Sequence, residues 1–147
     1  MPPLSSALEK TTKNKINIRL AKAYEKSKVL KWIEKHFWQE WVDECDVAFC
    51  NNPITCFIAT KNGIIIGFAC FEATSKNFFG PIGIDKEYRG KGVGKALLLS
   101  SLHQMRHLGY AYAIIGGGDG VEDFYSKSVG AIPIEGSTPG IYVDFLK

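Results

Sequence analysis

The sequence has little that would place the protein in a membrane or on a nucleic acid. Its 147 residues contain no apolar run that approaches the ~20 residues needed to span a bilayer, and no apolar region typical of a signal peptide follows the N-terminus. The formal net charge is only +3, and the basic residues are spread along the chain. We therefore expect a cytoplasmic protein whose partners include neither membranes nor nucleic acid.

Cysteine pairs with metal-binding or redox spacing are also absent. The four cysteines, at positions 45, 50, 56 and 70, form no C-x-x-C pair, and the last two lie in apolar, strand-like runs. Reduced, buried thiols are expected. His103 and His107 have the i, i+4 spacing of a metal pair, but no third ligand is near them in the sequence, so we expect two solvated histidines and no metal site.

What remains is the composition of an ordinary globular protein, with 46% hydrophobic and 22% charged residues. A polar stretch without a clear period precedes the first apolar alternation, which begins at Ile16. We expect a flexible N-terminal arm over residues 1–15 and a single domain over residues 16–147.

Apolar periodicity predicts the order β-α-α-β-β-β-α-β-α-β-β for this domain. The predicted strands cover residues 16–19, 55–60, 64–71, 78–84, 111–115, 132–134 and 141–145, and the predicted helices lie within residues 22–49, 96–108 and 121–129. Asp119 and Glu122 are expected to form a capping box at the start of the last helix. The strand-helix-strand unit across residues 78–115 implies a right-handed parallel crossover, so the fold class is α/β with a mixed sheet.

The most informative stretch is a basic, glycine-rich turn between the strand at residues 78–84 and the helix that follows it. The turn consists of Arg89, Gly90, Lys91, Gly92, Val93, Gly94 and Lys95. The first turn of a helix has N–H groups without intrahelical partners and the positive end of the helix dipole, and glycines let a ligand approach the backbone closely. The turn is therefore predicted to hold a pyrophosphate.

Two common nucleotide motifs do not fit this turn. The P-loop requires Ser or Thr after Gly-Lys and a glycine at its first position, but Ala96 and Arg89 stand there. The dinucleotide motif G-x-G-x-x-G fails because Lys95 occupies the place of the last glycine.

The pattern that does fit is R-x-x-G-x-G, formed by Arg89, Gly92 and Gly94 directly after a strand that ends at Ile84. With its flanking strand and helix, it resembles the acyl-CoA-binding core of the GCN5-related N-acetyltransferases (GNAT), and the resemblance covers nearly the whole chain from Ile16 onward. It implies the GNAT-like fold, acetyl-CoA as co-substrate, and transfer of the acetyl group to an amine of a small molecule or peptide by direct attack in a ternary complex.

The resemblance also implies how acetyl-CoA is held. The strand before the loop and the strand after the helix are expected to splay apart, with the pantetheine arm between them. The N–H groups of Ile82 and Ile84 are expected to bind this arm and to polarise the thioester carbonyl. The implied acetyl-CoA-binding residues are Ile82, Gly83, Ile84, Arg89, Gly90, Lys91, Gly92, Val93, Gly94 and Lys95.

The segment Phe124-Tyr125-Ser126-Lys127 is similar to the F-Y-x-K segment of the family, which implies that Tyr125 protonates the CoA thiolate. The family has a glycine four residues after this tyrosine, whereas Gly130 comes five residues after it. Because one residue turns a helix by about 100°, either the helix end is distorted or Tyr125 points elsewhere as a packed aromatic.

The predicted base is Glu72, at the end of the strand beside the one that precedes the loop, with Glu122 and Asp144 as further candidates. Each of them also fits a solvated surface charge, and the amine can lose its proton to water. The resemblance also implies a glutamate on the strand before the loop in some family members, but residues 78–84 contain no carboxylate. This difference and the shifted tyrosine leave one alternative function, a catalytically inactive acyl-CoA-binding module.

The resemblance also implies that the first two helices and the final hairpin form the walls of the acceptor pocket. Four aromatic residues there are candidates for its lining, and they equally fit a hydrophobic core: Trp32, Phe37, Trp38 and Trp41. The sequence does not identify the acceptor amine, and it leaves a homodimer open.

Overall fold

The computed structural model describes residues 1–117 and 120–147. Residues 2–117 form one compact unit, and residues 120–147 belong to a second unit with Met1. The prediction of a single domain over residues 16–147 stays a prediction.

A five-stranded sheet forms the centre of the first unit, with the strands in sequence order. Its strands are β1 (Ile16–Leu20), β2 (Cys56–Lys61), β3 (Ile64–Phe71), β4 (Phe78–Ile84) and β5 (Ile114–Ile115). Neighbours from β1 to β4 pair antiparallel, and β5 pairs parallel to β4. The predicted mixed sheet, and the parallel connection across the glycine-rich loop, are confirmed.

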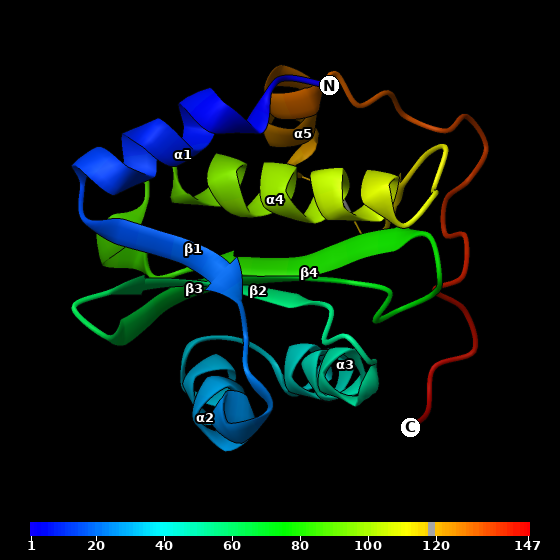
Figure 1. The fold of residues 1–147 in the computed structure, drawn as a ribbon. Coiled ribbons are helices and arrows are strands. Elements are labelled where there is room, and N and C mark those ends of the chain that lie inside the picture. Colours follow the sequence, from blue (N-terminus) through cyan, green and yellow to red (C-terminus); the bar gives the residue numbers. More distant parts are fainter. Residues whose placement is uncertain (118–119) are drawn as a thin grey trace. The chain divides into compact units, whose positions relative to one another are not determined.

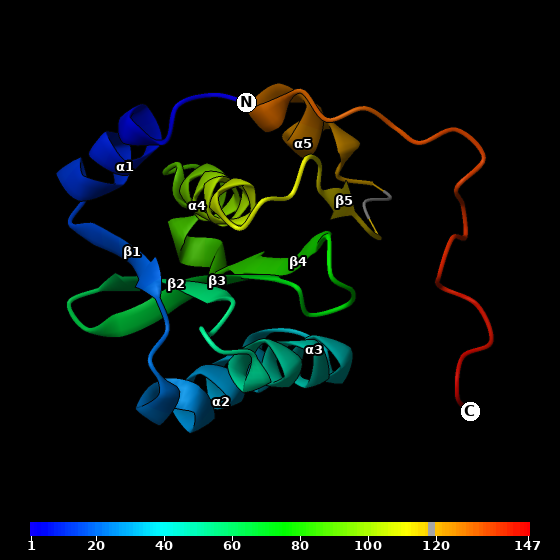
Figure 2. The same cartoon turned by 45° about the vertical axis from the view of Figure 1, so that its right-hand side comes forward.

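Helices cover both faces of this sheet (Figures 1 and 2). α2 (Lys26–His36) and α3 (Gln39–Cys50) lie on one face, after a short 3₁₀ turn η1 (Ala23–Glu25), and α4 (Val93–His107) lies on the other. The prediction of two helices within residues 22–49 is confirmed. α3 and the sheet enclose an apolar core that includes Ile33, Phe49 and Phe68.

The prediction of a flexible N-terminal arm is wrong over residues 4–13. This stretch forms α1 (Leu4–Lys13), which packs on α4 and β1. Its buried side chains are the small residues Ala7 and Thr11, and the Thr11 hydroxyl donates a hydrogen bond to the Leu8 carbonyl at 2.9 Å. Leu4, Ala7, Leu8 and Thr11 do have helical spacing, so the sequence contains a signal for this helix among the surrounding polar residues.

The packing of α1 also explains the burial of α4. Residues 96–101 of α4 are all buried, because the sheet covers one side of the helix and α1 the other.

The second unit contains α5 (Glu122–Val129) and an extended C-terminal segment. The expected cap Asp119 lies outside the described residues. The predicted closing hairpin is wrong, because residues 131–147 contain no strand. Local turns engage backbone groups that a ladder needs, since the N–H of Ser137 donates to Ile134 O and the N–H of Tyr142 donates to Pro139 O. The acceptor wall expected from this hairpin is therefore not formed.

Across the described ranges, no helix has both the length and the apolar character required to cross a bilayer.

Candidate active site

The glycine-rich loop leaves β4 through a short 3₁₀ turn, η2 (Lys86–Tyr88), and enters α4. The Asp85 carboxylate caps this turn by accepting a hydrogen bond from the Glu87 N–H at 3.0 Å. Gly90 and Gly92 then have left-handed backbone conformations, with φ of 79° and 82°. Gly92 is the N-cap of α4, so the left-handed residue sets the direction in which the helix begins.

The start of α4 is open to an anion. In the described part of the chain, no side chain caps this helix, and its first intrahelical bond runs from the Ala96 N–H to the Gly92 carbonyl at 3.1 Å. The N–H groups of residues 93–95 therefore have no intrahelical acceptor, and the dipole of a helix of 15 residues adds positive potential. The side chains of Arg89, Lys91 and Lys95 are exposed around them. This arrangement can bind a pyrophosphate.

A further cation, Lys10 of α1, reaches the same loop, and the sequence analysis missed it. A Cβ atom added to Gly92 would lie 2.9 Å from Lys10 Cδ and 3.3 Å from Lys10 Cε. The methylene chain of Lys10 therefore runs over Gly92, and its ammonium lies one bond beyond Cε. A prediction of α1 as a helix could have identified Lys10 as a loop residue. The packing of α1 on α4 is what brings Lys10 to the loop.

The last part of β4 has polar backbone groups that β3 does not use. The Asp85 N–H donates to Ile66 O at 2.8 Å, and Ile84 lies opposite Gly67. Because N–H and C=O groups alternate between the two sides of an antiparallel strand, those of Ile82 and Ile84 point away from β3.

On that other side, β5 pairs only with the first two residues of β4, Phe78 and Phe79. Within the described ranges no strand pairs with this edge of β4 beyond Phe79. The register of β4 against β3 also shifts between Ala69 and Phe71, next to Gly80 and Pro81, as expected for a strand in which proline supplies no N–H donor. The opening expected between β4 and β5 is therefore present where a pantetheine arm could pair with Ile82 and Ile84.

The four aromatic residues predicted near the acceptor form one cluster with Phe68. The ring centroid of Phe37 lies 5.1 Å from that of Trp41, and those of Trp38 and Trp41 are 4.8 Å apart. A Cβ atom on Gly83 would lie 2.5 Å from Phe37 Cζ, so the absence of a side chain at Gly83 makes room for this ring against β4. Trp38 is 61% exposed, which places an accessible aromatic surface beside the free edge of β4.

Glu72, the predicted base, lies away from the loop. Its N–H donates to Phe78 O at the start of β4, whereas the loop follows Ile84 at the end of that strand. At 3.3 Å per residue, this separation is about 20 Å. The carboxylate accepts a hydrogen bond from the Tyr110 hydroxyl at 2.7 Å and lies 3.5 Å from the Lys76 ammonium.

These contacts also affect Tyr110, since burial and the hydrogen bond to Glu72 raise the pKa of its phenol to about 12. Glu72 borders a cavity of about 200 Å³ that Gln104 and Leu108, near the end of α4, also line. The contacts of Glu72 are those of a structural carboxylate. Of the other candidate bases, Glu122 accepts a hydrogen bond from the Gly120 N–H at 2.9 Å, and Asp144 is exposed.

Tyr125 belongs to α5 in the second unit. Burial raises the pKa of its phenol to about 12, and its ring lies edge-on to Phe124 with centroids 5.1 Å apart. The Gly130 N–H donates to Ser126 O at 2.9 Å, and the Ala131 N–H donates to Tyr125 O at 3.4 Å. With Gly130 in the left-handed conformation at φ of 69°, these two bonds form an ordinary glycine C-cap.

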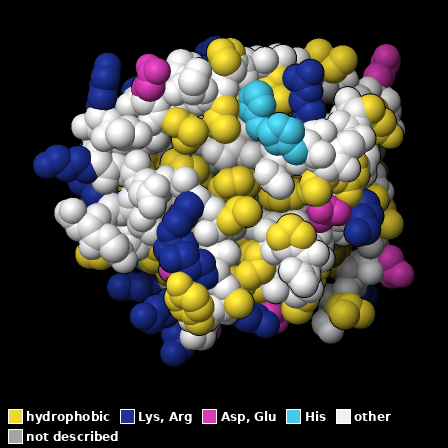
Figure 3. Space-filling view, in the orientation of Figure 1, with side chains coloured by type: hydrophobic (Ala, Val, Ile, Leu, Met, Phe, Trp, Pro, Cys, Tyr) yellow, Lys and Arg dark blue, Asp and Glu magenta, His cyan; other side chains and the backbone are white. Residues whose placement is uncertain are grey.

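On the face drawn in Figure 3, Lys and Arg are scattered among polar and apolar side chains.

Comparisons with known proteins agree with this geometry. The family model described as the acetyltransferase (GNAT) family matches residues 17–131. No curated protein sequence matches the chain.

Several solved structures share the fold. An aminoglycoside acetyltransferase, meta-AAC0020, from an uncultured soil metagenomic sample in complex with sisomicin is 15% identical, with a TM-score of 0.63 over 92% of this chain and 97% of that chain. The GNAT family N-acetyltransferase YhbS from Escherichia coli in complex with CoA is 16% identical, with a TM-score of 0.60 over 76% of this chain and 67% of that chain. A GNAT family acetyltransferase from Brucella melitensis in complex with acetyl-CoA is 16% identical, with a TM-score of 0.57 over 75% of this chain and 80% of that chain.

Proposed function

The chain belongs to the GNAT acetyltransferase family and is an acetyl-CoA-dependent N-acetyltransferase, and we propose that residues 82–95 bind acetyl-CoA while an amine attacks beside the aromatic cluster. The observation that carries this proposal is the continuity of two binding elements. The unpaired edge of β4 at Ile82 and Ile84 leads directly into the uncapped N-terminus of α4.

In this arrangement the pyrophosphate of acetyl-CoA lies on the N–H groups of residues 93–95. Arg89 and Lys10 neutralise its charge from two sides of the loop, and Gly92 lets the phosphate reach the backbone. The pantetheine arm adds to the free edge of β4 by pairing with Ile82 and Ile84. The Ile82 N–H then points at the thioester carbonyl and stabilises the oxyanion that forms during attack.

The acceptor amine is proposed to dock against Phe37, Trp38 and Trp41. Trp38 is the exposed member of this group, and the partly buried Phe37 packs against Gly83 of β4, the strand on which the thioester would sit. An aromatic face suits an amine whose neighbouring atoms are apolar, and it also attracts the amine while it is protonated. One structural neighbour was solved with the aminoglycoside sisomicin, so aminoglycosides belong among the acceptors to be tested.

The reaction needs a neutral amine, a positioned thioester and a stabilised leaving thiolate. The nitrogen lone pair forms the C–N bond, the C–S bond then breaks, and the amine loses its proton. We propose that the Tyr125 phenol acts on the departing thiolate. Water is the simplest acceptor of the amine proton, because the Glu72 carboxylate is already engaged by Tyr110 and Lys76.

The test of this function is the release of free CoA thiol from acetyl-CoA on a panel of amines: aminoglycosides, aryl amines, polyamines and peptides with free N-termini. Product mass must show one acetyl group on the acceptor. A thermal melt with and without acetyl-CoA runs in parallel, because a ligand of the folded state raises the melting temperature. Stabilisation by acetyl-CoA without turnover on any amine would favour the inactive binding module.

A further inference from the structure

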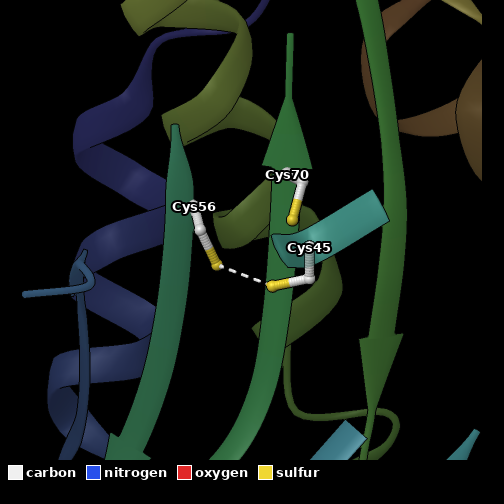
Figure 4. A group of neighbouring side chains, drawn as sticks. All are labelled: Cys45, Cys56 and Cys70. Carbon is white, nitrogen blue, oxygen red and sulfur yellow. Dashed lines mark hydrogen bonds between the residues drawn. The ribbon is translucent and has the colours of Figure 1, made fainter. Parts of the chain in front are cut away.

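Three cysteines converge in the core of the first unit, away from the glycine-rich loop. Cys45 comes from α3, Cys56 from β2 and Cys70 from β3, and all three side chains have 0% exposure (Figure 4). Cys56 and Cys70 are opposite each other in the antiparallel pair, so their side chains share the face of the sheet that α3 covers. The register of the sheet therefore brings together thiols that the sequence separates.

The sulfur atoms have the spacing of a three-coordinate site. The Sγ atoms of Cys45 and Cys56 are 3.8 Å apart, and all three Sγ atoms lie within 4.8 Å of one another. For a pyramidal central atom with bonds of about 2.3 Å to sulfur and bond angles of about 95°, the three sulfurs lie about 3.4 Å apart. A contraction of about 0.4 Å between Cys45 and Cys56, and of at most about 1.4 Å at the longest edge, would complete this geometry.

The surroundings determine which central atom fits. The neighbours of the three cysteines in the core are apolar, among them Ile33, Ala48 and Phe68. Within the ranges that the structure describes, the group of metal-ligating side chains consists of the three thiols alone. Zn²⁺ favours four ligands, and with three thiolates it would leave a net negative charge in an apolar core, which is costly.

We propose that Cys45, Cys56 and Cys70 form a binding site for trivalent arsenic, held as a neutral trithiolate. Arsenous acid, As(OH)₃, reacts with three thiols to form three As–S bonds. The three S–H bonds and three As–O bonds break, and each thiol proton leaves with a hydroxide as water. No oxidation or reduction occurs, and the product carries no charge, so the core need not supply a counter-ion.

Because the thiols have no exposed surface, arsenic must enter during local opening of α3 from the sheet. The bound product links α3 to β2 and β3. It should therefore stabilise the folded state, since it binds the native arrangement of the three thiols and the unfolded chain holds them apart.

Mass spectrometry under native conditions distinguishes the binding modes. The reduced full-length chain is incubated with arsenite and a phosphine reductant. The proposal predicts a species with one arsenic atom gained and three hydrogens lost. A species that retains one hydroxide and has lost two hydrogens would show a two-thiol complex, and it would overturn the proposal.

Matched variants show which cysteine sulfurs bind the arsenic. Cys50→Ser is the control, because Cys50 lies on the same helix but is exposed, and it should bind arsenite as the wild type does. Cys70→Ala should lose the species that lacks three hydrogens. Retention of that species in Cys70→Ala, or its loss in Cys50→Ser, would refute the assignment.

The incubation is repeated in urea at a concentration below that of the unfolding transition. Local opening is more frequent there, so this experiment distinguishes slow binding from no binding. The melting temperature of the wild type should rise with arsenite, and that of Cys70→Ala should rise less. Absence of the three-thiol species under both conditions overturns the proposal, as does binding of Zn²⁺ in preference to arsenite when both are offered.

Discussion

Gly92 offers the sharpest test of the acetyl-CoA site, because its substitution affects the backbone and the ligand separately. With φ of 82°, Gly92 has a left-handed conformation, in which an alanine costs roughly 1–2 kcal/mol. For a domain of this size, that loss lowers the melting temperature by roughly 2–8 °C. The added methyl group also displaces Lys10, whose Cδ lies 2.9 Å from the position of the new Cβ.

A second effect of Gly92→Ala appears only with the ligand. The methyl group stands where the pyrophosphate must approach the N–H groups of residues 93–95. Loss of one hydrogen bond to a charged group costs about 1.5–3 kcal/mol, so the affinity for acetyl-CoA should fall roughly 10- to 150-fold. Gly92→Val should abolish detectable binding, because a β-branched residue in a left-handed conformation distorts the turn itself.

Gly63 provides the matched control. It lies in the turn between β2 and β3 with φ of 75°, and a Cβ atom there meets nothing within 4 Å. Gly63→Ala should lose a similar amount of stability, with unchanged affinity for acetyl-CoA. Calorimetric titration gives the affinities and thermal melts the stabilities. If folded Gly92→Ala binds acetyl-CoA within twofold of Gly63→Ala, the loop does not hold the pyrophosphate.

Four further substitutions test individual side chains. Lys10→Met keeps the methylene chain over Gly92 but removes the charge, so CoA affinity should fall about two- to tenfold at low salt and less at high salt; a loss that does not depend on salt would contradict the role. Arg89→Ala should weaken CoA about tenfold or more but leave a pantetheine fragment without phosphates unaffected, and equal losses for both would make Arg89 structural. Glu72→Gln should lower the melting temperature and reduce kcat less than about threefold, whereas a loss of ~10²-fold or more would make Glu72 the base. Tyr125→Phe should reduce kcat about 10²-fold with little change in acetyl-CoA affinity, and wild-type turnover would remove the phenol from the reaction.

Much of the first unit could be predicted because its signals are local. The strand at residues 78–84 has the same bounds as β4, and the predicted hairpin turn at Asn62 and Gly63 forms with both residues at positive φ. The loop motif depends on neighbours in the chain, so its position before α4 follows from the sequence. α4 starts three residues before the predicted start, because Gly92 and Gly94 have low helix propensity and weaken the sequence signal of its first turn.

What the sequence did not predict depends on contacts between distant segments. Lys10 reaches Gly92 only because α1 packs on α4, and α1 itself buries no large side chain. The convergence of Cys45, Cys56 and Cys70 requires the register of β2 against β3, and a shift of one residue would turn one of the strand cysteines to the other face. The predicted last hairpin fails for a related reason, because short apolar runs at residues 132–134 and 141–145 signal strands only when a neighbour completes their ladder.

Because burial raises the pKa of Tyr125, its phenol is a weaker proton donor to the CoA thiolate than an ordinary tyrosine. A thiol has a pKa of about 8.5, so complete proton transfer from a phenol at about 12 is uphill by about 3.5 pKa units, or about 5 kcal/mol. The proposed role of the phenol is therefore to stabilise the departing thiolate as a hydrogen-bond donor, without full transfer of its proton. Because the neutral phenol is the donor, its contribution should persist as pH rises and disappear only near pH 12. A fall in kcat centred near pH 10 that Tyr125→Phe removes would instead show a phenol of ordinary pKa, and full proton transfer to the thiolate would then cost about 2 kcal/mol.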